Sequence, residues 1–369
     1  MDTCDVLVVG GGPAGSSCAA TLCAAGLDVL VLDRALFPRP KTCAGWVTPQ
    51  LFETLGLTPE NYGQGRVLQP ITGFRLGLWG GRRTEVRYGG PVSYGILRAE
   101  LDDFLLRRSG ARLRLGEPLA ALERRGGRWL ANGEVAARWL VGAGGPRCPV
   151  ARRLGARGGT AVAALEVEIP LDGRPCPVSG DTPELWFTPD LKGYGWCFRK
   201  GDHLNVGLGV EGGGALKPRA AAFLASVWEP LAPRERPPLS GWAYRLWGHG
   251  PSRLVWDGTL LVGDAAGLAY PESGEGIRPA VESGVLAARA ILDDPGDPRA
   301  ERLHSYEQAL RRRLGPPRAP AGPPSTLRRL AGRVLLGSRP FLRRIVLDRW
   351  FLRRADPPLR PAAALVGPG

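Results

Sequence analysis

Three glycines near the N-terminus have the spacing of a phosphate-binding turn. Gly10, Gly12 and Gly15 form a G-x-G-x-x-G pattern, which follows an apolar run and precedes small residues typical of a helix. Gly10 allows a tight turn, Gly12 lets a pyrophosphate approach the backbone, and the helix N-terminus attracts its charge. The next apolar run ends at Asp33, whose carboxylate can accept a hydrogen bond from a ribose 2′-OH. We therefore expect a dinucleotide site; the alternative is a structural glycine turn in an ordinary βαβ unit.

Two further segments could hold anionic groups. Residues 38–45 read PRPKTCAG, and their basic side chains can neutralise phosphate charge. The alternative is a proline-rich turn around a buried cysteine.

Arg98 opens a predicted helix, where its charge opposes the helix dipole. A bound phosphate would compensate that charge; otherwise Arg98 is a solvated surface residue.

The longest motif lies much later in the chain. Residues 261–267 read LVGDAAG and residues 271–277 read PESGEGI, and a helix is predicted over 276–292. An aspartate at the end of a strand offers a carboxylate to a ligand. Glycines at the start of a helix expose backbone amides.

Together these motifs resemble those of the geranylgeranyl reductase family of FAD-dependent oxidoreductases, which are built like p-hydroxybenzoate hydroxylase. The resemblance implies FAD, with the loop of residues 38–45 over the flavin and Arg98 reaching the cofactor. Asp264 would accept from the ribityl chain, and amides near Gly274 and Gly276 would stabilise the N1–C2=O edge of reduced flavin. The implied cofactor-binding residues are Gly10, Gly12, Pro13, Ala14, Gly15, Asp33, Arg34, Lys41, Cys43, Ala44, Arg98, Gly263, Asp264, Gly274, Gly276 and Ile277.

The chain departs from the family pattern within the region of resemblance, roughly residues 1–310. Ala44 replaces a glycine of the flavin loop, Arg199 stands where proline is usual, and Gly144 replaces the aspartate of a G-A-D-G motif. In related hydroxylases that aspartate is tied to FAD and NAD(P)H binding. Gly144 therefore weakens the expectation that NAD(P)H reduces the flavin directly. NAD(P)H or a reduced ferredoxin-type donor is expected as the transient reductant.

The resemblance implies reduction of C=C bonds in a prenyl, isoprenoid or other lipophilic substrate. Reduced flavin delivers hydride from N5 to one carbon, and an acid must protonate the other. Cys43 is the first candidate acid, with a buried inert thiol as the alternative. Glu275 is the second, although loop anchoring is its more expected role. The substrate pocket is expected to contain Trp46, Tyr194 and Trp196; the last two equally fit the core of a sheet.

Three other activities stay open. A monooxygenase or hydroxylase on a small or aromatic substrate shares the fold, and dependence on oxygen would separate it from a reductase. A flavin halogenase needs a lysine between flavin and substrate, and the chain offers no obvious candidate among Lys41, Lys192, Lys200 and Lys217. The third is a flavoprotein electron carrier without substrate turnover, to which Gly144 gives some weight.

The expected elements place these residues in an α/β fold. A Rossmann-like FAD-binding domain would carry an inserted mixed or antiparallel β-sheet substrate domain and a helical C-terminal region. The FAD-binding domain is discontinuous, with residues 1–50, 98–158 and 256–296. The substrate domain takes residues 51–97 and 159–255, and the arginine-rich C-terminal region takes residues 297–369.

The C-terminal region bears on how a lipophilic substrate is reached. Residues 326–354 contain nine arginines and one acid, Asp348, with apolar residues at near-helical spacing. Such a stretch is typical of peripheral contact with an anionic membrane surface. The alternative is a helix packed on the protein's own body with its arginines in solvent.

The composition limits the class of protein. The 369 residues carry a formal net charge of +14, without a recognised nucleic-acid-binding module. Seven cysteines without a C-x-x-C pattern argue against a disulfide framework and a zinc site, so we expect no metal. No apolar run is long enough to span a membrane. We expect a cytoplasmic, membrane-associated monomer or homodimer that takes a lipophilic small molecule and no nucleic acid.

Overall fold

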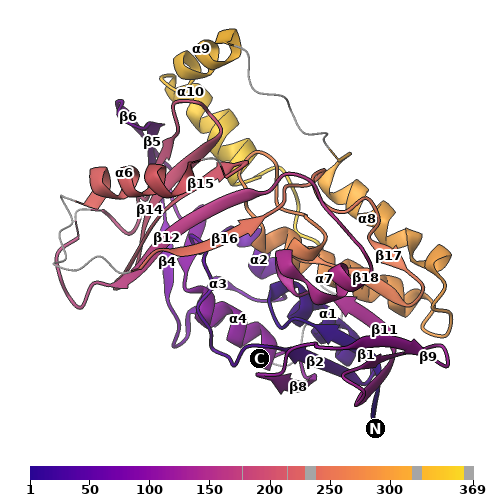
Figure 1. Ribbon diagram of the computed structural model, residues 1–369. Coiled ribbons are helices and arrows are strands. Elements are labelled where there is room, and N and C mark those ends of the chain that lie inside the picture. The colour runs from indigo at the N-terminus through magenta and orange to yellow at the C-terminus, as the bar shows by residue number, and fades with distance from the viewer. Residues whose placement is uncertain (177, 214, 229–237, 318–325, 361–369) are drawn as a thin grey trace.

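Three β-sheets organise the part of the chain that the structure describes. The computed structural model describes residues 1–176, 178–213, 215–228, 238–317 and 326–360. Its strands form an eight-stranded, a seven-stranded and a three-stranded sheet. In Figure 1 the eight-stranded sheet lies at the bottom, beneath several helices, and the seven-stranded sheet lies above it. This arrangement confirms the predicted α/β fold class. Parts of the predicted substrate domain and of the C-terminal region lie outside the described residues.

The eight-stranded sheet contains the βαβ unit predicted at the N-terminus. Its strands are β1 (Asp2–Val9), β2 (Val29–Asp33), β8 (Arg112–Leu115), β9 (Leu122–Arg125), β10 (Arg128–Ala131), β11 (Val135–Gly142), β17 (Val255–Trp256) and β18 (Thr259–Leu261). Their order is β17-β18-β11-β1-β2-β8, and the β9–β10 hairpin pairs antiparallel to β11. The pairs β18–β11, β11–β1, β1–β2 and β2–β8 are all parallel. Their carboxyl ends therefore meet at one edge, where open α/β sheets bind ligands.

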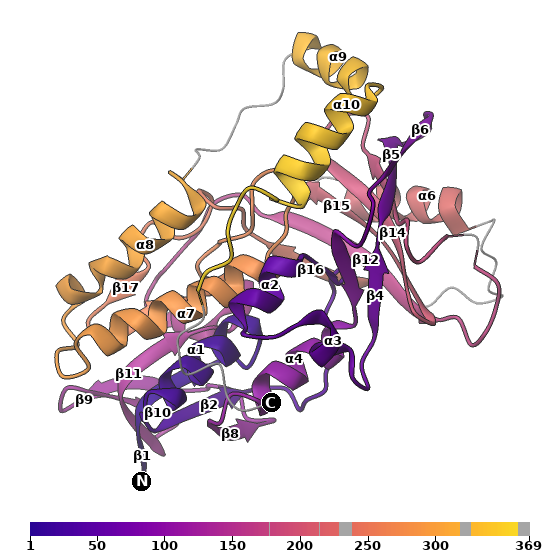
Figure 2. The same ribbon diagram turned by 180° about the vertical axis from the view of Figure 1, so that it is seen from behind.

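Helices from distant parts of the chain lie against this sheet. They are α1 (Pro13–Ala24), α4 (Arg98–Arg107), α5 (Pro149–Arg153), α7 (Ile277–Asp293) and α8 (His304–Leu314), with short 3₁₀ turns η1 (Gly145–Arg147), η2 (Gly263–Ala265) and η3 (Ala300–Leu303). α1 contacts both α4 and α7, and α8 packs against α7 (Figure 2). The helix predicted over residues 276–292 forms as α7.

The closest packing in this layer joins α1 to α7. A Cβ atom at Gly284 would come within 2.2 Å of the backbone oxygen of Ala14. A Cβ atom at Gly263 would lie 2.9 Å from the Ala14 side chain. Both distances are shorter than van der Waals contact, so only glycine allows this approach. The approach places the N-termini of α1 and α7 on the same cavity, although they are far apart in sequence.

The seven-stranded sheet is mixed, as predicted for the inserted sheet. Its strands are β5 (Gly73–Leu78), β6 (Arg83–Arg87), β12 (Val162–Pro170), β13 (Glu184–Phe187), β14 (Gly193–Lys200), β15 (His203–Glu211) and β16 (Ser240–Tyr244). Their order is β16-β12-β15-β14-β13-β5-β6, with β13 and β5 parallel and the other neighbours antiparallel. Helix α6 (Leu216–Trp228) packs on β15 and β12, where Phe223 is fully buried.

The three-stranded sheet links the two larger ones. It consists of β3 (Trp46–Val47), β7 (Ser93–Ile96) and β4 (Leu68–Ile71), in that order. Two short helices, α2 (Pro49–Thr54) and α3 (Pro59–Gly63), lie between β3 and β4. The predicted substrate-domain segment, residues 51–97, thus contains helical turns besides its strands. α2 contacts α7, so this segment also borders the helical layer.

The C-terminal region is helical, as predicted, and part of it packs on the protein's own body. It contains α9 (Thr326–Leu335), α10 (Arg339–Phe341) and a π-helix, η4 (Leu342–Phe351). Apolar residues of η4 are buried against the seven-stranded sheet: Leu342, Val346, Leu347 and Phe351. In contrast, α9 projects at the edge of the molecule (Figure 1) and exposes Leu330, Val334 and Leu335. Among the described residues, no helix is long and apolar enough to cross a membrane.

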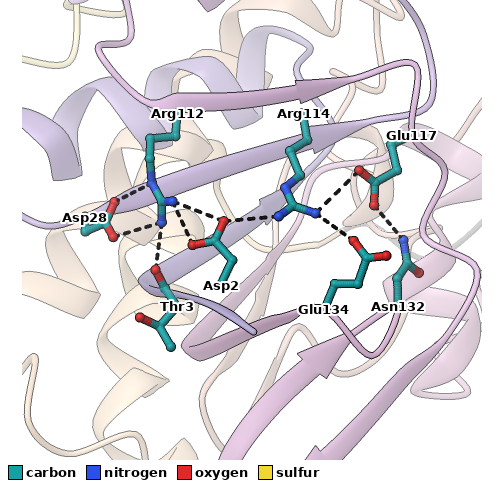
Figure 3. A network of polar contacts seen from close by, with 8 residues as sticks. All are labelled: Asp2, Thr3, Asp28, Arg112, Arg114, Glu117, Asn132 and Glu134. Atoms are coloured by element: carbon teal, nitrogen blue, oxygen red, sulfur yellow. Dashed lines mark hydrogen bonds and ion pairs between the residues drawn. The ribbon is translucent and has the colours of Figure 1, made fainter.

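A network of ion pairs ties the edge strand β8 to its neighbours (Figure 3). Arg112 pairs with Asp2 and Asp28, and Arg114 pairs with Asp2 and Glu134. The Arg112 side chain is 44% exposed and its partners are 30% and 48% exposed, so solvent screens these pairs. Exposed and screened ion pairs contribute little to stability, so backbone pairing with β2, rather than this network, sets the register of β8.

We expect Gly284→Ala to destabilise the protein by about 1–3 kcal/mol, because the added methyl group must force α7 away from α1. A lowered midpoint of thermal unfolding, followed by circular dichroism, would report the loss. Gly89→Ala is the matched control, since a Cβ atom at Gly89 meets no heavy atom within 4 Å. Equal midpoints for the two variants would show that the helices tolerate the extra atom.

Candidate active site

A cavity of about 1080 Å³ lies between the carboxyl edge of the eight-stranded sheet and one face of the seven-stranded sheet. Ligand pockets in proteins are usually about 300–1,000 Å³, so this cavity has room for a large ligand. Most residues predicted for the site line it. They are Gly10, Gly12, Pro13, Ala14, Asp33, Arg34, Lys41, Cys43, Ala44, Trp46, Arg98, Tyr194, Trp196, Asp264, Gly274, Glu275, Gly276 and Ile277.

Gly15 and Gly263 were also predicted to bind the cofactor, but neither lines the cavity. A Cβ atom at Gly15 would lie 1.9 Å from the backbone oxygen of Gly10, so Gly15 lets α1 start directly beneath the turn. Gly263 packs against Ala14, as described above. Both glycines therefore support the shape of the site from behind its surface.

The turn after β1 opens toward the cavity. Gly10 has φ +114°, and a Cβ atom there would lie 2.4 Å from the Ala143 oxygen, so this position requires glycine. Gly12 is different, because its φ is −74° and the nearest atom to a Cβ would be Nη2 of Arg39 at 3.6 Å. The folded chain alone does not require glycine at position 12. The N-terminus of α1 also lacks a side-chain cap, which leaves its amides to a ligand.

Asp33 stands at the end of β2 and is held by the backbone. One carboxylate oxygen accepts a hydrogen bond from the Gly11 N–H at 2.7 Å, and the other accepts from the Ala35 N–H at 2.9 Å. A carboxylate has about four lone-pair positions, so it can still accept from a ligand hydroxyl. Asp33 therefore has the position and the free acceptor capacity that the ribose interaction requires.

Arg98 is buried at the start of α4 and pairs with a carboxylate on the same helix. Two of its guanidinium nitrogens donate to Asp102, each at 2.8 Å. Although burial opposes the charge, Asp102 holds the pKa of Arg98 above its usual value. The expected compensation by a bound phosphate is thus not required, because Asp102 already supplies the opposite charge. Asp102 also lies 3.3 Å from Arg39, so two cations share one anion and the cluster can attract a phosphate.

Lys41 extends from the same loop over an aromatic ring. Its Nζ lies 3.7 Å from the ring centroid of Trp242, a cation–π contact. Burial, with the nearby charge of Arg98, lowers the pKa of Lys41 to about 8. The Trp242 indole N–H donates to Asp264 at 3.4 Å. Trp242 thereby connects the predicted cofactor residues of the N-terminal loop and of the later motif.

Glu275 precedes the N-terminus of α7. It accepts a hydrogen bond from the backbone N–H of Arg278 at 2.7 Å, which anchors the loop to the first turn of the helix. Burial raises the pKa of Glu275 to about 7. The N-cap residue of α7 is Gly276, which has no side chain to cap the helix. A second helix N-terminus therefore borders the cavity.

An aromatic wall closes the part of the cavity away from the turn after β1. The Trp46 ring is stacked on Phe351 of η4 with centroids 5.3 Å apart, and Tyr194 meets Phe351 edge to face at 5.4 Å. Tyr194 donates to the Ser273 oxygen at 2.6 Å, and the Trp196 indole N–H donates to Asn205 at 2.6 Å. The polar atoms of Tyr194 and Trp196 are thus engaged, whereas the Trp46 indole N–H is buried without a partner among the described residues. The rings present mainly carbon to the cavity.

Trp242, Phe351 and Glu166 are among the cavity residues that were missed in the sequence. Trp242 and Phe351 lie in segments without a recognised motif, and no local signal marks them. Glu166 is different, because Glu166 and Glu168 alternate with apolar residues along β12. Such alternation places both acids on one face of a strand. That pattern could have singled out Glu166 as a cavity residue.

The cavity fits a flavin dinucleotide. The uncapped N-terminus of α1, a fixed Asp33 and an uncrowded Gly12 match the needs of a pyrophosphate and a ribose, and the N-terminus of α7 borders the same cavity. The aromatic wall lies in the same cavity, so a substrate could meet the flavin there.

Comparisons with known proteins agree with this geometry. The family model described as FAD binding domain matches residues 3–72. A menaquinone reductase from Mycobacterium tuberculosis is 34% identical over 323 residues, 79% of this chain and 77% of that protein. Digeranylgeranylglycerophospholipid reductase 1 from Methanothermobacter thermautotrophicus is 29% identical over 341 residues, 84% of this chain and 83% of that protein. The chain belongs to the geranylgeranyl reductase family. It is an FAD-dependent oxidoreductase.

A solved structure shows how far the family fold extends. A geranylgeranyl bacteriochlorophyll reductase-like protein from Thermoplasma acidophilum superimposes with a TM-score of 0.71 at 22% identity. The match covers 99% of this chain and 95% of that chain. At this identity the likeness concerns the fold alone.

We expect Gly12→Ala to weaken FAD binding without changing the stability of the FAD-free protein. The methyl group has space in the folded chain but would occupy the path of the pyrophosphate. A steric cost of about 1–3 kcal/mol corresponds to roughly a 5- to 150-fold rise in Kd. Fluorescence titration with FAD would measure it, and unfolding of the FAD-free variant would check stability. An unchanged Kd would place the pyrophosphate elsewhere.

Proposed function

We propose that this protein reduces C=C bonds of a long prenyl or isoprenoid substrate. The observation that carries the proposal is the aromatic wall of Trp46, Tyr194, Trp196 and Phe351 within the cavity that fits FAD. Such a surface suits an apolar chain and offers few polar groups to orient a small polar substrate. The relatives named for menaquinone and for a digeranylgeranyl glycerophospholipid support the same substrate class.

The residues of this chain bind and orient the reactants in the proposed reaction. Reduced FAD supplies the hydride when it is bound. Gly12 and the N-terminus of α1 would hold the pyrophosphate, Asp33 the ribose, and Asp264 the ribityl chain. Trp46 and Trp196 would hold the alkene in position and keep water from it, since an isolated C=C is not polarised and depends on positioning.

In this proposal the two predicted domains have different roles, one binding FAD and the other the substrate. Residues 1–50, 98–158 and 256–296 would bind FAD, and residues 51–97 and 159–255 would enclose the substrate. Membership of the two large sheets supports this division. Trp46 is an exception, because β3 pairs with β7 on the substrate side. Phe351 adds the C-terminal region, residues 297–369, to the substrate wall.

The experiment that tests the function is an anaerobic single turnover. Purified protein with chemically reduced FAD is mixed with geranylgeranyl compounds, and the products are analysed by mass spectrometry. We expect a gain of two hydrogens for each bond reduced, together with reoxidation of the flavin. Product that forms only in the presence of O₂ would identify a monooxygenase. Flavin that cycles without any product would identify an electron carrier.

A halogenase is disfavoured by the positions of the lysines. Lys200 is fully buried and pairs with Glu168, so it cannot stand between flavin and substrate. Lys192 and Lys217 are exposed. Lys41 lines the cavity, but it lies over Trp242 in the loop assigned to the cofactor. These positions support the reductase over the halogenase.

We further propose that α9 rests on an anionic lipid surface, from which the substrate is taken. Leu330, Val334 and Leu335 are 60%, 70% and 43% exposed on this helix. Arg333 beside them, and Arg339 in the next helix, are also exposed. Exposed apolar residues bordered by arginines suit the interface of an anionic bilayer. α9 is followed closely by η4, which carries Phe351 into the cavity.

We expect replacement of Leu330, Val334 and Leu335 together by serine to weaken binding to phosphatidylglycerol vesicles at least tenfold, because apolar contact with lipid is lost. Vesicle co-sedimentation would measure it. Leu36→Ser is the matched control, since Leu36 is 71% exposed outside the C-terminal region. Turnover of detergent-solubilised substrate should persist in both variants. If both variants sediment equally with the vesicles, α9 does not contact the lipid.

A further inference from the structure

Glu166 is a buried carboxyl group on the cavity wall. It lies on β12, and its side chain is directed into the cavity with those of Ala164 and Glu168. One carboxyl oxygen accepts a hydrogen bond from the Cys43 N–H at 2.6 Å. The other oxygen is buried and has no hydrogen-bond partner among the described residues. A buried polar atom without a partner is costly, and in a cavity it marks a place for a proton or a ligand.

The charges around Glu166 leave it without a cation of its own. Lys200 is fully buried, but it pairs directly with Glu168. The amide of Asn205 also donates to Glu168, at 3.0 Å. Burial raises the pKa of Glu166 to about 7, and the charge of Glu168 adds to this; the Cys43 N–H, Lys200 and Asn205 act in the opposite direction. Glu166 therefore holds a proton below about neutral pH.

Glu166 lies where the two halves of the cavity meet. Its backbone neighbour on β15 is Gly207, and a Cβ atom at Gly207 would lie 2.3 Å from the Trp196 ring and 2.8 Å from the Glu166 Cβ. The absence of a side chain at Gly207 lets the indole and the carboxyl group lie side by side. On its other side Glu166 contacts the Cys43 backbone, in the loop assigned to the flavin.

The two acids considered from the sequence are placed less favourably. The Cys43 sulfur accepts a hydrogen bond from the Gly45 N–H at 3.4 Å, and Arg98 lies close enough to interact with it. The Cys43 sulfur is therefore engaged by the backbone of its own loop. Glu275 is tied to the first turn of α7, in the part of the cavity assigned to FAD.

We propose that Glu166 is the acid that protonates the alkene in the reaction proposed above, on which this inference rests. Hydride from the reduced flavin forms a C–H bond at one carbon of the double bond. The O–H bond of Glu166 breaks as the second C–H bond forms at the other carbon, and a carboxylate is left. Water then returns a proton to that carboxylate. Glu168, which lines the same cavity and is 33% exposed, marks the side from which water reaches it.

The decisive variant is Glu166→Gln, which keeps the shape and the acceptor for the Cys43 N–H but has no acidic proton. We expect wild-type alkene reduction to slow as pH rises through about 7, because Glu166 loses its proton. E166Q should bind FAD normally, reduce the alkene about 10²- to 10⁴-fold more slowly, and lose this pH dependence. Added formic or acetic acid should partly restore the reaction in Glu166→Ala, where it can enter the vacated space.

The proton on Glu166 can also be detected without any turnover, so this inference can be tested independently of the proposed function. Near neutral pH the infrared carbonyl band of protonated carboxyl groups should contain one component that E166Q lacks and another, from Glu275, that E166Q keeps. E275Q should retain the component that is lost in E166Q. If no isoprenoid is reduced by wild type, the proposed function fails, whereas the infrared band still reports the proton on Glu166. Alkene reduction by E166Q at the wild-type rate with an unchanged pH profile, or no difference in the infrared spectra, overturns the role of Glu166.

Discussion

The approach of α7 to the backbone of Ala14 is the contact on which the site depends. It lets two helices that start far apart in sequence point their N-termini into one cavity. Each N-terminus carries partial positive charge, and together they would suit the anionic parts of the proposed flavin dinucleotide site. A side chain at Gly284 would move α7 away from α1 and so separate these two partial charges. The close packing of the two helices is therefore also what gathers positive charge at the cavity.

The buried charges of the cavity follow a consistent arrangement. Cations on α4 and at the end of β14 are paired with acids: Arg98 with Asp102, and Lys200 with Glu168. Two carboxyl groups, Glu166 and Glu275, instead lie without a bridging cation and have pKa values raised by burial to about 7. The cavity thus has cations that can attract phosphates. It also has two carboxyl groups that hold protons near neutral pH, one of which, Glu166, lies beside the aromatic wall.

Sequence motifs were enough to predict the fold class, and most of the residues predicted for the site line the cavity. The glycine turn, Asp33 and the motif around Asp264 are contiguous signals, because the backbone shape that they need is local. The partners of those residues were harder to predict. Asp102 lies one turn after Arg98, a spacing visible in the sequence, and it was overlooked. Glu166 could not be ranked, because its environment depends on Cys43, 123 positions away, and on the absence of a side chain at Gly207.

The position of Phe351 near the C-terminal end also sets an order for assembly during synthesis. Chains fold from the N-terminus as they leave the ribosome. The strands and helices that border the flavin part of the cavity are complete at Asp293, whereas the last ring of the aromatic wall is about 60 residues later. A nascent chain can therefore take up FAD while the apolar part of its cavity is still open. The aromatic wall is complete only when η4 has been made, because Phe351 packs on Trp46 and Tyr194.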